Sequence, residues 1–394
     1  MTHNLPGSAA DNNIRAEFII IGAGIAGASL GYWLAPHGKV LLLERESQPG
    51  YHSTGRSAAL FMESYGTAQV RSLTMASRAF LQNPPPGFTE HPLLSPRGAM
   101  FVATAGQEAS LNAHWEVLRS VTARARQLTA AQACDMVPVL KKELIVGAVY
   151  EPDASDMDVH AIHQGYLRGV RKAGGMLVCN AGVTAMSHNG EGWLVSAGEL
   201  LYEAPVVINA AGAWVDTVAA LAGARPIGIE PRRRSAFIFP PPEGIDTNAW
   251  PMVVSTTEDW YIKPDAGMLL GSPANADPVE PQDIQPEEMD IAIAIHRIEE
   301  ITTLGIRRPT RTWAGLRSFV ADGNLVAGFD EQAPGFFWLA AQGGYGIQTS
   351  PAMGETCAAL VRGLSVPEHT ASFGLTAEML SPARIRALAA SDCL

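Results

Sequence analysis

Three glycines near the start of the chain have the spacing of a site that binds a dinucleotide. Gly22 and Gly24 follow a continuous apolar run, residues 18–21, and Gly27 lies at the start of a helix-compatible stretch, residues 26–35. In that setting the first glycine permits a tight turn, the second lets a pyrophosphate approach the backbone, and the third lets the helix pack on the strand. The N–H groups and the dipole at the start of the helix favour phosphate oxygens.

An acidic residue completes this pattern. Glu44 lies 22 residues beyond Gly22, at the end of a second apolar run, residues 40–43. Its carboxylate can accept hydrogen bonds from ribose hydroxyls and would repel a 2′-phosphate. A glycine-rich turn without a ligand is the alternative, and the order strand, turn, helix, strand argues against it.

Two further segments favour FAD over NAD as the dinucleotide. Residues 50–59 are rich in small side chains and can follow an extended cofactor, whereas an NAD dehydrogenase more often enters its next strand–helix unit directly. Near the C-terminus, an apolar run at 336–340 leads into a glycine turn at 342–346. A helix-compatible stretch at 347–361 follows, and Pro351 is expected to fit its first turn. We therefore expect a cofactor domain built from both ends of the chain.

The composition excludes several other classes of protein. The chain has 394 residues, of which 47% are apolar and 17% charged, so it can bury large cores in two or three domains. A formal net charge of −11 argues against nucleic acid or an anionic membrane as the main partner. The four cysteines contain no Cys-x-x-Cys pair, so neither a metal site nor a redox dithiol is expected.

The N-terminal residues lack the pattern of a secretory signal, and residues 1–13 are expected to form a flexible tail. Residues 18–38 contain no charged side chain, but their glycines and Pro36 argue against a membrane-spanning helix. A cytoplasmic location is expected, with peripheral membrane association left open.

The chain resembles a known group of flavoproteins. The resemblance is carried by residues 22–27, Glu44, and residues 53–57, 209–214 and 342–346, and it is to the FAD-dependent D-amino acid oxidase/glycine oxidase superfamily. Within this superfamily the chain is most similar to bacterial D-arginine dehydrogenases. The similar stretches are residues 50–59, 91–97, 233–239, 263–280, 313–322 and 343–349.

The resemblance and the order of elements together predict an α/β fold with two domains. A Rossmann-like FAD-binding domain is built from discontinuous segments, and a β-sheet domain with flanking helices (α+β) binds the substrate. The expected FAD-binding segments are residues 14–90, 140–224 and 318–394. The expected substrate-binding segments are residues 91–139 and 225–317.

The resemblance also implies where FAD binds, without a covalent bond. The early glycines would meet the pyrophosphate, Glu44 the adenosine ribose, and the C-terminal glycine turn the pyrimidine side of the flavin. His52 is tempting as a catalytic base, but a structural histidine beside the cofactor is favoured. The implied cofactor-binding residues are Gly22, Gly24, Ile25, Ala26, Gly27, Glu44, Arg45, His52, Ser53, Thr54, Arg56, Ser57, Ala58, Val183, Ala210, Gly212, Trp214, Gly315, Arg317, Gly343, Gly344, Tyr345, Gly346, Ile347 and Gln348.

A D-amino acid needs a fixed clamp for its carboxylate, and arginine binds carboxylates through two hydrogen bonds. The resemblance places Arg234 and Arg317 in contact with the substrate. An extended strand would point Arg232 and Arg234 one way and Arg233 the other, and a solvated edge is the alternative for this run. Arg317 is the stronger candidate because it stands alone in an apolar segment, where an unpaired charge is costly to bury.

Three other residues are expected at the substrate. Tyr261 corresponds to a tyrosine whose hydroxyl binds the carboxylate, with core packing as the alternative. Tyr65 corresponds to a tyrosine on a loop that covers the site, with a mobile surface aromatic as the alternative. The carbonyl of Gly344 could accept a hydrogen bond from the substrate amine.

One position departs from the D-arginine dehydrogenase pattern. Those enzymes carry an acid just after a Ser-Pro-Arg turn, where it receives the cationic side chain, and the matching residue here is Ala99. Glu63 is the only nearby acid that could replace it. Because a buried guanidinium without a counter-charge is strongly disfavoured, apolar or aromatic side chains are expected to be preferred over arginine.

The expected reaction is oxidative deamination of a D-amino acid by hydride transfer to flavin N5, giving a 2-oxo acid and ammonia. The alternatives are an FAD enzyme for a secondary amine, an imino acid or a 2-hydroxy acid, an NAD(P)-linked oxidoreductase, and a non-catalytic flavoprotein. The electron acceptor remains open among quinone, a carrier protein and oxygen.

Overall fold

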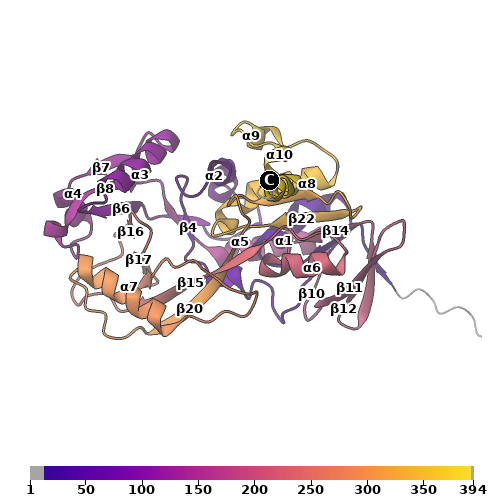
Figure 1. Cartoon of the computed structure of the whole chain (residues 1–394), viewed down its shortest axis with the longest axis horizontal. Helices are drawn as coiled ribbons and strands as arrows, with labels where there is room; N and C mark the ends of the chain where they lie inside the picture. Colours follow the sequence, from indigo (N-terminus) through magenta and orange to yellow (C-terminus); the bar gives the residue numbers. More distant parts are fainter. Residues whose placement is uncertain (1–12, 392–394) are drawn as a thin grey trace, which may run out of the picture.

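The computed structural model describes residues 13–391, so the expected N-terminal tail lies outside the described residues apart from Asn13. The described chain forms two lobes side by side (Figure 1). Strands β15 (Glu230–Phe239) and β20 (Arg311–Phe319) pair with each other and run between the lobes. The predicted α/β fold is confirmed.

One lobe is organised around a six-stranded sheet whose members come from both ends of the chain. Its strands are short and apolar, as strands covered on both faces should be. The first five are parallel and the last is antiparallel. In spatial order they are β10 (Met176–Val178), β3 (Val40–Leu43), β2 (Phe18–Ile21), β14 (Val206–Asn209), β22 (Phe336–Ala340) and β21 (Val326–Phe329).

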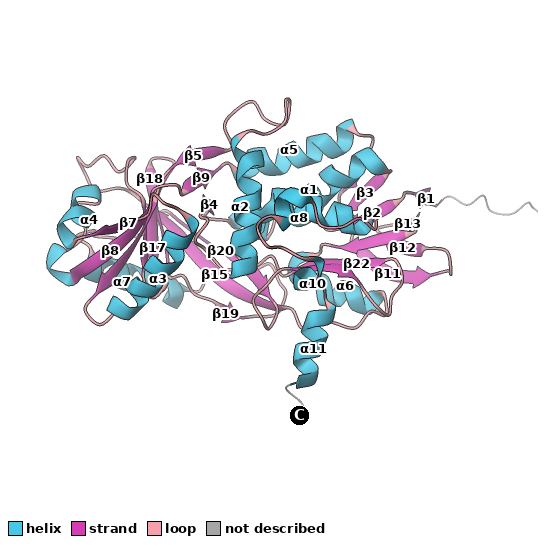
Figure 2. Cartoon of the chain, turned by 90° about the horizontal axis from the view of Figure 1, so that it is seen from above, coloured by secondary structure: helices cyan, strands magenta, loops and turns pink. Residues whose placement is uncertain are grey.

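Helices cover one face of this sheet and a second, smaller sheet covers the other (Figure 2). Alternate residues of β2 separate accordingly, because Ile20 packs toward the helices and Ile19 toward the small sheet. The helices are α1 (Ile25–Leu34), α2 (Ala68–Gln82), α5 (Val159–Lys172) and α8 (Gly346–Val361). The opposite face packs against β1 (Ile14–Arg15), β13 (Leu200–Ala204), β12 (Trp193–Ala197), β11 (Val183–His188) and α6 (Val215–Leu221).

The other lobe is organised around a nine-stranded sheet. Its strands are β19 (Asp277–Pro278), β15, β18 (Met268–Ser272), β17 (Tyr261–Asp265), β16 (Met252–Ser255), β6 (Ala99–Thr104), β8 (Ile145–Glu151) and β7 (Arg126–Leu128), with β20 beside β15. Met100 and Val102 of β6 pack with α4 (Ala130–Met136) and α7 (Glu288–Ile301). Ala99 and Phe101 point to the opposite face, which α3 (Glu108–Val121) covers in part.

The remaining elements are short. A three-stranded sheet joins β4 (Leu60–Phe61), β9 (Ser155–Met157) and β5 (Leu94–Pro96), and the C-terminal helices are α9 (Glu368–Ala371), α10 (Ala377–Leu380) and α11 (Ala383–Ser391). Single 3₁₀ turns lie at Ala35–His37, Ser53–Arg56, Lys142–Leu144 and Gly212–Trp214. Within the part of the chain that is described, no helix has both the length and the apolar character needed to cross a bilayer.

The domain boundaries remain a prediction, and β8 gives a reason to adjust them. Residues 140–224 were expected in the cofactor domain, yet β8 pairs with β6 and β7 in the nine-stranded sheet. We propose that the cofactor domain resumes after Glu151 rather than at residue 140.

The sequence predicted Pro351 in the first turn of its helix, and this prediction was wrong. α8 begins at Gly346, so Pro351 falls in the second turn, where its missing N–H leaves the carbonyl of Ile347 without a helical donor. The hydroxyl of Ser350 donates to that carbonyl at 2.9 Å. A neighbouring side chain therefore replaces the lost hydrogen bond, and the helix continues through the proline.

Candidate active site

The two glycine turns meet at one end of the six-stranded sheet. β2 and β22 flank β14, so the turns that follow them lie close together at the carboxyl ends of parallel strands. Gly24 from the first turn and Gly343 from the second line the same cavity, which we call the cofactor cavity. Ligands of open α/β sheets bind at such an edge.

Steric contacts explain why glycine is needed in the first turn. Gly22 has a φ of +100°, and a Cβ on it would lie 2.5 Å from the carbonyl oxygen of Ala210. A Cβ on Gly27 would lie 2.0 Å from the carbonyl oxygen of Gly22, so Gly27 lets α1 pack on the turn, as predicted. Gly24 instead faces the cavity, with the Thr54 hydroxyl 3.3 Å from where its Cβ would be.

Glu44 is fixed at the end of β3 beside this turn. One carboxylate oxygen accepts the N–H of Ala23 at 3.0 Å, and the other accepts the N–H of Glu46 at 3.0 Å. The side chain is buried and lines the cofactor cavity. An oriented acid at this place can accept a hydrogen bond from a ribose hydroxyl.

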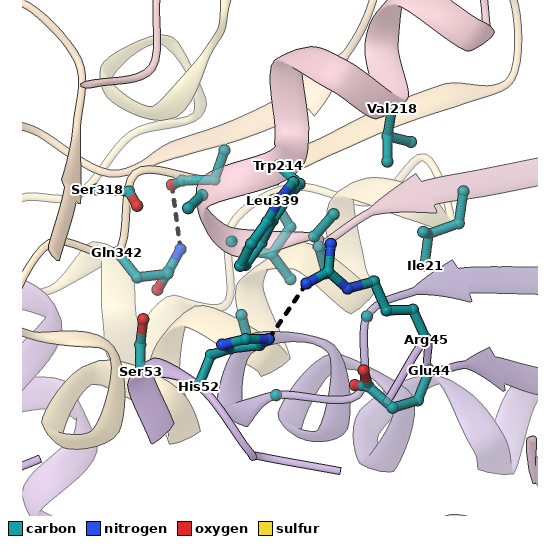
Figure 3. A pocket seen from close by; sticks show the side chains of 18 of the residues that line it. Ile21, Glu44, Arg45, His52, Ser53, Trp214, Val218, Ser318, Leu339 and Gln342 are labelled. Carbon is teal, nitrogen blue, oxygen red and sulfur yellow. Dashed lines mark hydrogen bonds between the residues drawn. The ribbon is translucent and has the colours of Figure 1, made fainter. Parts of the chain in front are cut away.

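Three side chains that contact one another, Arg45, His52 and Trp214, line one part of the cofactor cavity (Figure 3). The guanidinium of Arg45 lies 4.0 Å from the ring centre of Trp214, and the His52 ring lies 4.8 Å from Trp214. His52 Nε2 lies 2.9 Å from the carboxylate of Glu46, and hydrogen bonds from His52 and Arg45 lower the pKa of Glu46. Nδ1 of His52 is buried and has no hydrogen-bond partner among the described residues. Its neighbours therefore hold this histidine in place beside the cavity.

A second cavity, which we call the arginine pocket, lies where β15, β17 and β20 face the segment between β4 and α2. We name that segment, residues 62–67, the lid segment. Four of the five predicted substrate residues converge here as side chains, and the fifth, Gly344, supplies backbone. They are Tyr65, Arg234, Tyr261, Arg317 and Gly344. A third cavity, lined by Arg56, Gly315 and Gly346 among others, shares lining residues with both.

The arginines of this pocket have no acidic partner. Arg317 Nη1 donates to the Tyr65 hydroxyl at 3.1 Å, and Arg234 Nε donates to the carbonyl of Asn275 at 2.6 Å. Among the described residues neither forms a salt bridge. Burial and the nearby charge of Arg317 lower the pKa of Arg234, although a guanidinium stays protonated in proteins. Two cations facing one cavity favour an anionic ligand.

The alternation predicted for the arginine run is confirmed. Arg233 points to the opposite side of β15, where it pairs with Asp290 at 3.0 Å and with Glu287. Arg232 is more exposed and pairs with Glu230 at 2.6 Å. Only Arg234 of the three lines the arginine pocket, so the solvated-edge alternative fits Arg232 alone.

Gly344 lies directly against Arg317. A Cβ on Gly344 would come within 2.8 Å of the guanidinium carbon, so any side chain would displace the arginine. Gly343 before it has a φ of +52°. The C-terminal glycine turn thus serves the arginine pocket as well as the cofactor cavity.

The rest of the arginine pocket is mainly apolar. Its large apolar side chains are Leu60, Met62, Phe101, Met157, Met252, Val254 and Ile347. Glu258, at the turn between β16 and β17, is the one acid in this lining and is exposed. Glu63 does not line the pocket, because its carboxylate pairs with Arg78 at 2.6 Å. The expectation that Glu63 is the only nearby acid was therefore wrong, because Glu258, which is distant in the chain, lines the pocket and Glu63 does not.

Most predicted cofactor residues line one of the three cavities. The exceptions are Gly27, which packs α1 on the first turn, and Tyr345, whose ring contacts that of Tyr65 at 5.0 Å. Sequence reasoning assigned no role to several other residues that line the cavities. They include Tyr51, Val218, Ser318, Leu339 and Gln342 in the cofactor cavity, and Phe101, Met252 and Glu258 in the arginine pocket.

Comparison with known proteins gives the family. Residues 17–360 match the family of FAD dependent oxidoreductases known as DAO, so this chain belongs to that family and its cofactor is FAD. A glycine oxidase of Geobacillus kaustophilus is 25% identical over 382 residues, which cover 92% of this chain and 97% of that protein. A bovine FAD-dependent oxidoreductase domain-containing protein 1 is 24% identical over 88% of this chain and 81% of its own length.

Solved structures show the same fold. The crystal structure of glycine oxidase from Geobacillus kaustophilus superposes with a TM-score of 0.80 at 23% identity, covering 92% of this chain and 99% of the other. L-proline dehydrogenase from P. horikoshii gives a TM-score of 0.81 at 20% identity, covering 95% and 99% of the two chains. The family match confirms the predicted superfamily, and the glycine cradle and the fixed Glu44 fit an FAD molecule.

Proposed function

We propose that the protein oxidatively deaminates D-amino acids, with a preference for apolar or aromatic side chains over arginine. The observation that carries this proposal is the pair of guanidinium groups, Arg234 and Arg317, that face one pocket without an acidic partner. The hydroxyl of Tyr65 already contacts Arg317, and Tyr261 lines the same pocket. A substrate carboxylate would supply the missing negative charge.

The expected reaction divides the work between cofactor and chain. Bound FAD would supply the acceptor for the hydride that leaves the substrate Cα. The lone pair of the substrate amine, bound in its neutral form, would complete the C=N bond of a protonated imino acid. Water then converts the imino acid to a 2-oxo acid and ammonia. The chain's own residues would hold the carboxylate at Arg317 and Arg234 and accept a hydrogen bond from the amine at the carbonyl of Gly344.

The apolar lining supports the proposed side-chain preference. Ala99 is fully buried, and Glu63 is paired with Arg78, so neither offers a counter-charge inside the pocket. Glu258 could meet a long cationic side chain at the surface, where an ion pair contributes only about 0–1 kcal/mol. Methionine, leucine or phenylalanine side chains would instead pack against the methionines and Phe101.

The D configuration rests on the resemblance to D-arginine dehydrogenases. Among relatives of the family are an N-methyl-L-tryptophan oxidase, 25% identical over 52% of this chain, and the L-proline dehydrogenase. Their names favour a second candidate for this chain, the oxidation of a secondary amine. Both candidates use the same carboxylate clamp, so substrates must decide between them.

An anaerobic reduction screen tests the proposal. The purified protein, saturated with FAD, is mixed with D-leucine, D-methionine, D-phenylalanine, D-arginine, their L-isomers, sarcosine and L-proline, and the flavin absorbance is followed. We expect bleaching by the apolar D-isomers. Bleaching by sarcosine or proline alone would select the secondary amine, a large preference for D-arginine would refute the Ala99 argument, and no bleaching would refute the proposal. Re-oxidation by air or by a quinone then identifies the acceptor.

A further inference from the structure

A fully buried acid lies beside the arginine pocket and takes no part in the roles described so far. Glu151 is the last residue of β8 and has no exposed surface. In the register of the sheet it is the direct partner of Ala99. Directly opposed residues of antiparallel strands point to the same face, so Glu151 faces the lid segment, as Ala99 does.

The carboxylate of Glu151 is bound to the lid segment through both oxygens. One oxygen accepts the N–H of Glu63 at 2.9 Å, and the other accepts the hydroxyl of Ser64. Among the described residues it forms no salt bridge. A buried carboxylate without a cation is costly, and core packing alone would be served better by an apolar residue.

The lid segment links Glu151 to the substrate residues Tyr65 and Arg317. Tyr65 follows Ser64, and its hydroxyl accepts the hydrogen bond from Arg317 at 3.1 Å. The start of the segment is held separately, because the N–H of Met62 donates to the side chain of Gln348 at 3.2 Å. Glu151 therefore holds the part of the lid segment nearest to Tyr65.

We propose that Glu151 is a positioning residue, whose carboxylate holds residues 63 and 64 so that the hydroxyl of Tyr65 stays against Arg317 over the arginine pocket. This inference rests on the proposed function only for the identity of the substrate. When the two hydrogen bonds are lost, Tyr65 should leave Arg317, and the substrate carboxylate should bind less tightly.

The charges around Glu151 leave it without a fixed counter-charge. On the lid segment the nearest is Glu63, which is neutralised by Arg78 of α2. Asp153, which follows β8, is paired with Arg124. Asp156 of β9 is paired with Arg97 and Lys263. Burial raises the pKa of Glu151 to about 7, against hydrogen bonds from Ser64 and Glu63 that lower it. The grip on the lid segment should accordingly strengthen as the pH rises through this value.

The test compares Glu151→Gln with Glu63→Gln in the FAD-saturated protein. Glu151→Gln keeps the size of the side chain but loses its charge. Glu63→Gln changes the same segment while leaving the backbone N–H that Glu151 binds. Amide hydrogen exchange over residues 60–67 is measured at pH 8 without substrate, and kcat and KM are measured across pH 6 to 9 with the substrate found in the screen.

We expect Glu151→Gln to lower the exchange protection of this segment and to raise KM, each by about fivefold to tenfold, because a hydrogen bond to a charged group is lost. The value of kcat should change much less, and the rise of kcat/KM near pH 7 should disappear. Glu63→Gln loses the ion pair with Arg78 but keeps the N–H that Glu151 binds, so it should change protection and KM less than Glu151→Gln and should keep the rise of kcat/KM near pH 7. The effect of Glu151→Gln on KM should also vanish in a Tyr65→Phe background, as expected for a residue that acts through Tyr65.

A lower melting temperature with unchanged protection, KM and pH profile would overturn the inference and leave Glu151 a structural residue. If Glu151→Gln does not fold, Ser64→Ala removes one of the two hydrogen bonds and should shift protection and KM in the same direction. Because exchange is measured without substrate, it tests the inference even if the substrate screen refutes the proposed function.

Discussion

Tyr65 and Arg317 are 252 residues apart in the chain, yet Nη1 of Arg317 donates a hydrogen bond to the Tyr65 hydroxyl at 3.1 Å. The contact joins the lid segment to β20, a strand that also pairs with the strand carrying Arg234. Because it is the only hydrogen bond of the Arg317 guanidinium among the described residues, the arginine keeps most of its donors free for a ligand.

The first prediction concerns this arginine. Arg317→Met should lower kcat/KM by about a hundredfold or more. The substitution removes the partner of the substrate carboxylate, and the loss of one member of a buried charged pair typically costs about 2–5 kcal/mol. The flavin content should fall much less than kcat/KM, because Arg317 does not line the cofactor cavity. Steady-state kinetics with the best substrate and the flavin absorbance of the purified protein measure both effects.

Arg311→Met is the matched control on the same strand, because Arg311 is exposed and lies outside the three cavities. It should leave kcat/KM within about twofold of wild type, as surface substitutions usually cost little. Equal losses in the two variants would mean that β20 is sensitive to any change of charge and that Arg317 has no special role.

The second prediction concerns the cradle of the cofactor. Gly22→Ala should destabilise the protein and reduce its FAD content, because a Cβ would meet the carbonyl oxygen of Ala210 at 2.5 Å and the φ of +100° disfavours a side chain. Gly363→Ala is the control, since Gly363 also has a positive φ, +73°, but open space around it. The difference in unfolding free energy should be about 1–3 kcal/mol, the usual cost of overpacking. Similar losses in both variants would assign the effect to φ alone.

The nucleotide half of the site could be predicted because its signal is local. Gly22, Gly24, Gly27 and Glu44 fall within one strand–helix–strand unit, so spacing alone determines how they meet. Glu258 and Glu151 could not be found in this way. Ala99 and Glu151 become neighbours through the register of β6 and β8, and no periodic pattern in the sequence reports that register.

The rule that places proline in the first turn of a helix also failed, because a side chain replaced the backbone hydrogen bond that the proline removes. Proline is usual in a first helical turn, so Pro351 was expected there, but the Ser350 hydroxyl satisfies the carbonyl that the proline leaves free. The N–H of Ala352 donates to the Ser77 hydroxyl at 3.1 Å, which supports the helix from α2. Such tertiary partners are not visible to a rule based on sequence spacing.

The third prediction concerns Glu258, the exposed acid in the lining of the arginine pocket. Glu258→Gln should lower kcat/KM for D-arginine by no more than about fivefold, because an exposed ion pair is worth about 0.2–1 kcal/mol. It should leave the value for D-methionine unchanged. The ratio of the two kcat/KM values measures the effect, and a much larger loss with D-arginine would show that Glu258 replaces the acid missing at Ala99.

The fourth prediction is a dependence of stability on pH that Glu151 should cause. Its pKa rises from about 4.5 in the unfolded chain to about 7 in the folded protein, so the folded state binds this proton more tightly. The stability that this gives is fully present below pH 4.5 and is lost as the pH rises through 7. Because one pKa unit corresponds to about 1.4 kcal/mol, the loss in unfolding free energy is on the order of 3 kcal/mol. Relative to Glu151→Gln, the wild type should therefore become less stable between pH 5 and pH 8.

Urea unfolding of both proteins at equal FAD concentration measures this difference. If the unfolding free energies of the two proteins change in parallel with pH over that range, the carboxyl group of Glu151 is not held in a protonated state. The charged form that costs stability is also the form that can bind two donors of the lid segment, so the pH at which the protein loses stability should be the pH at which its affinity for substrate improves.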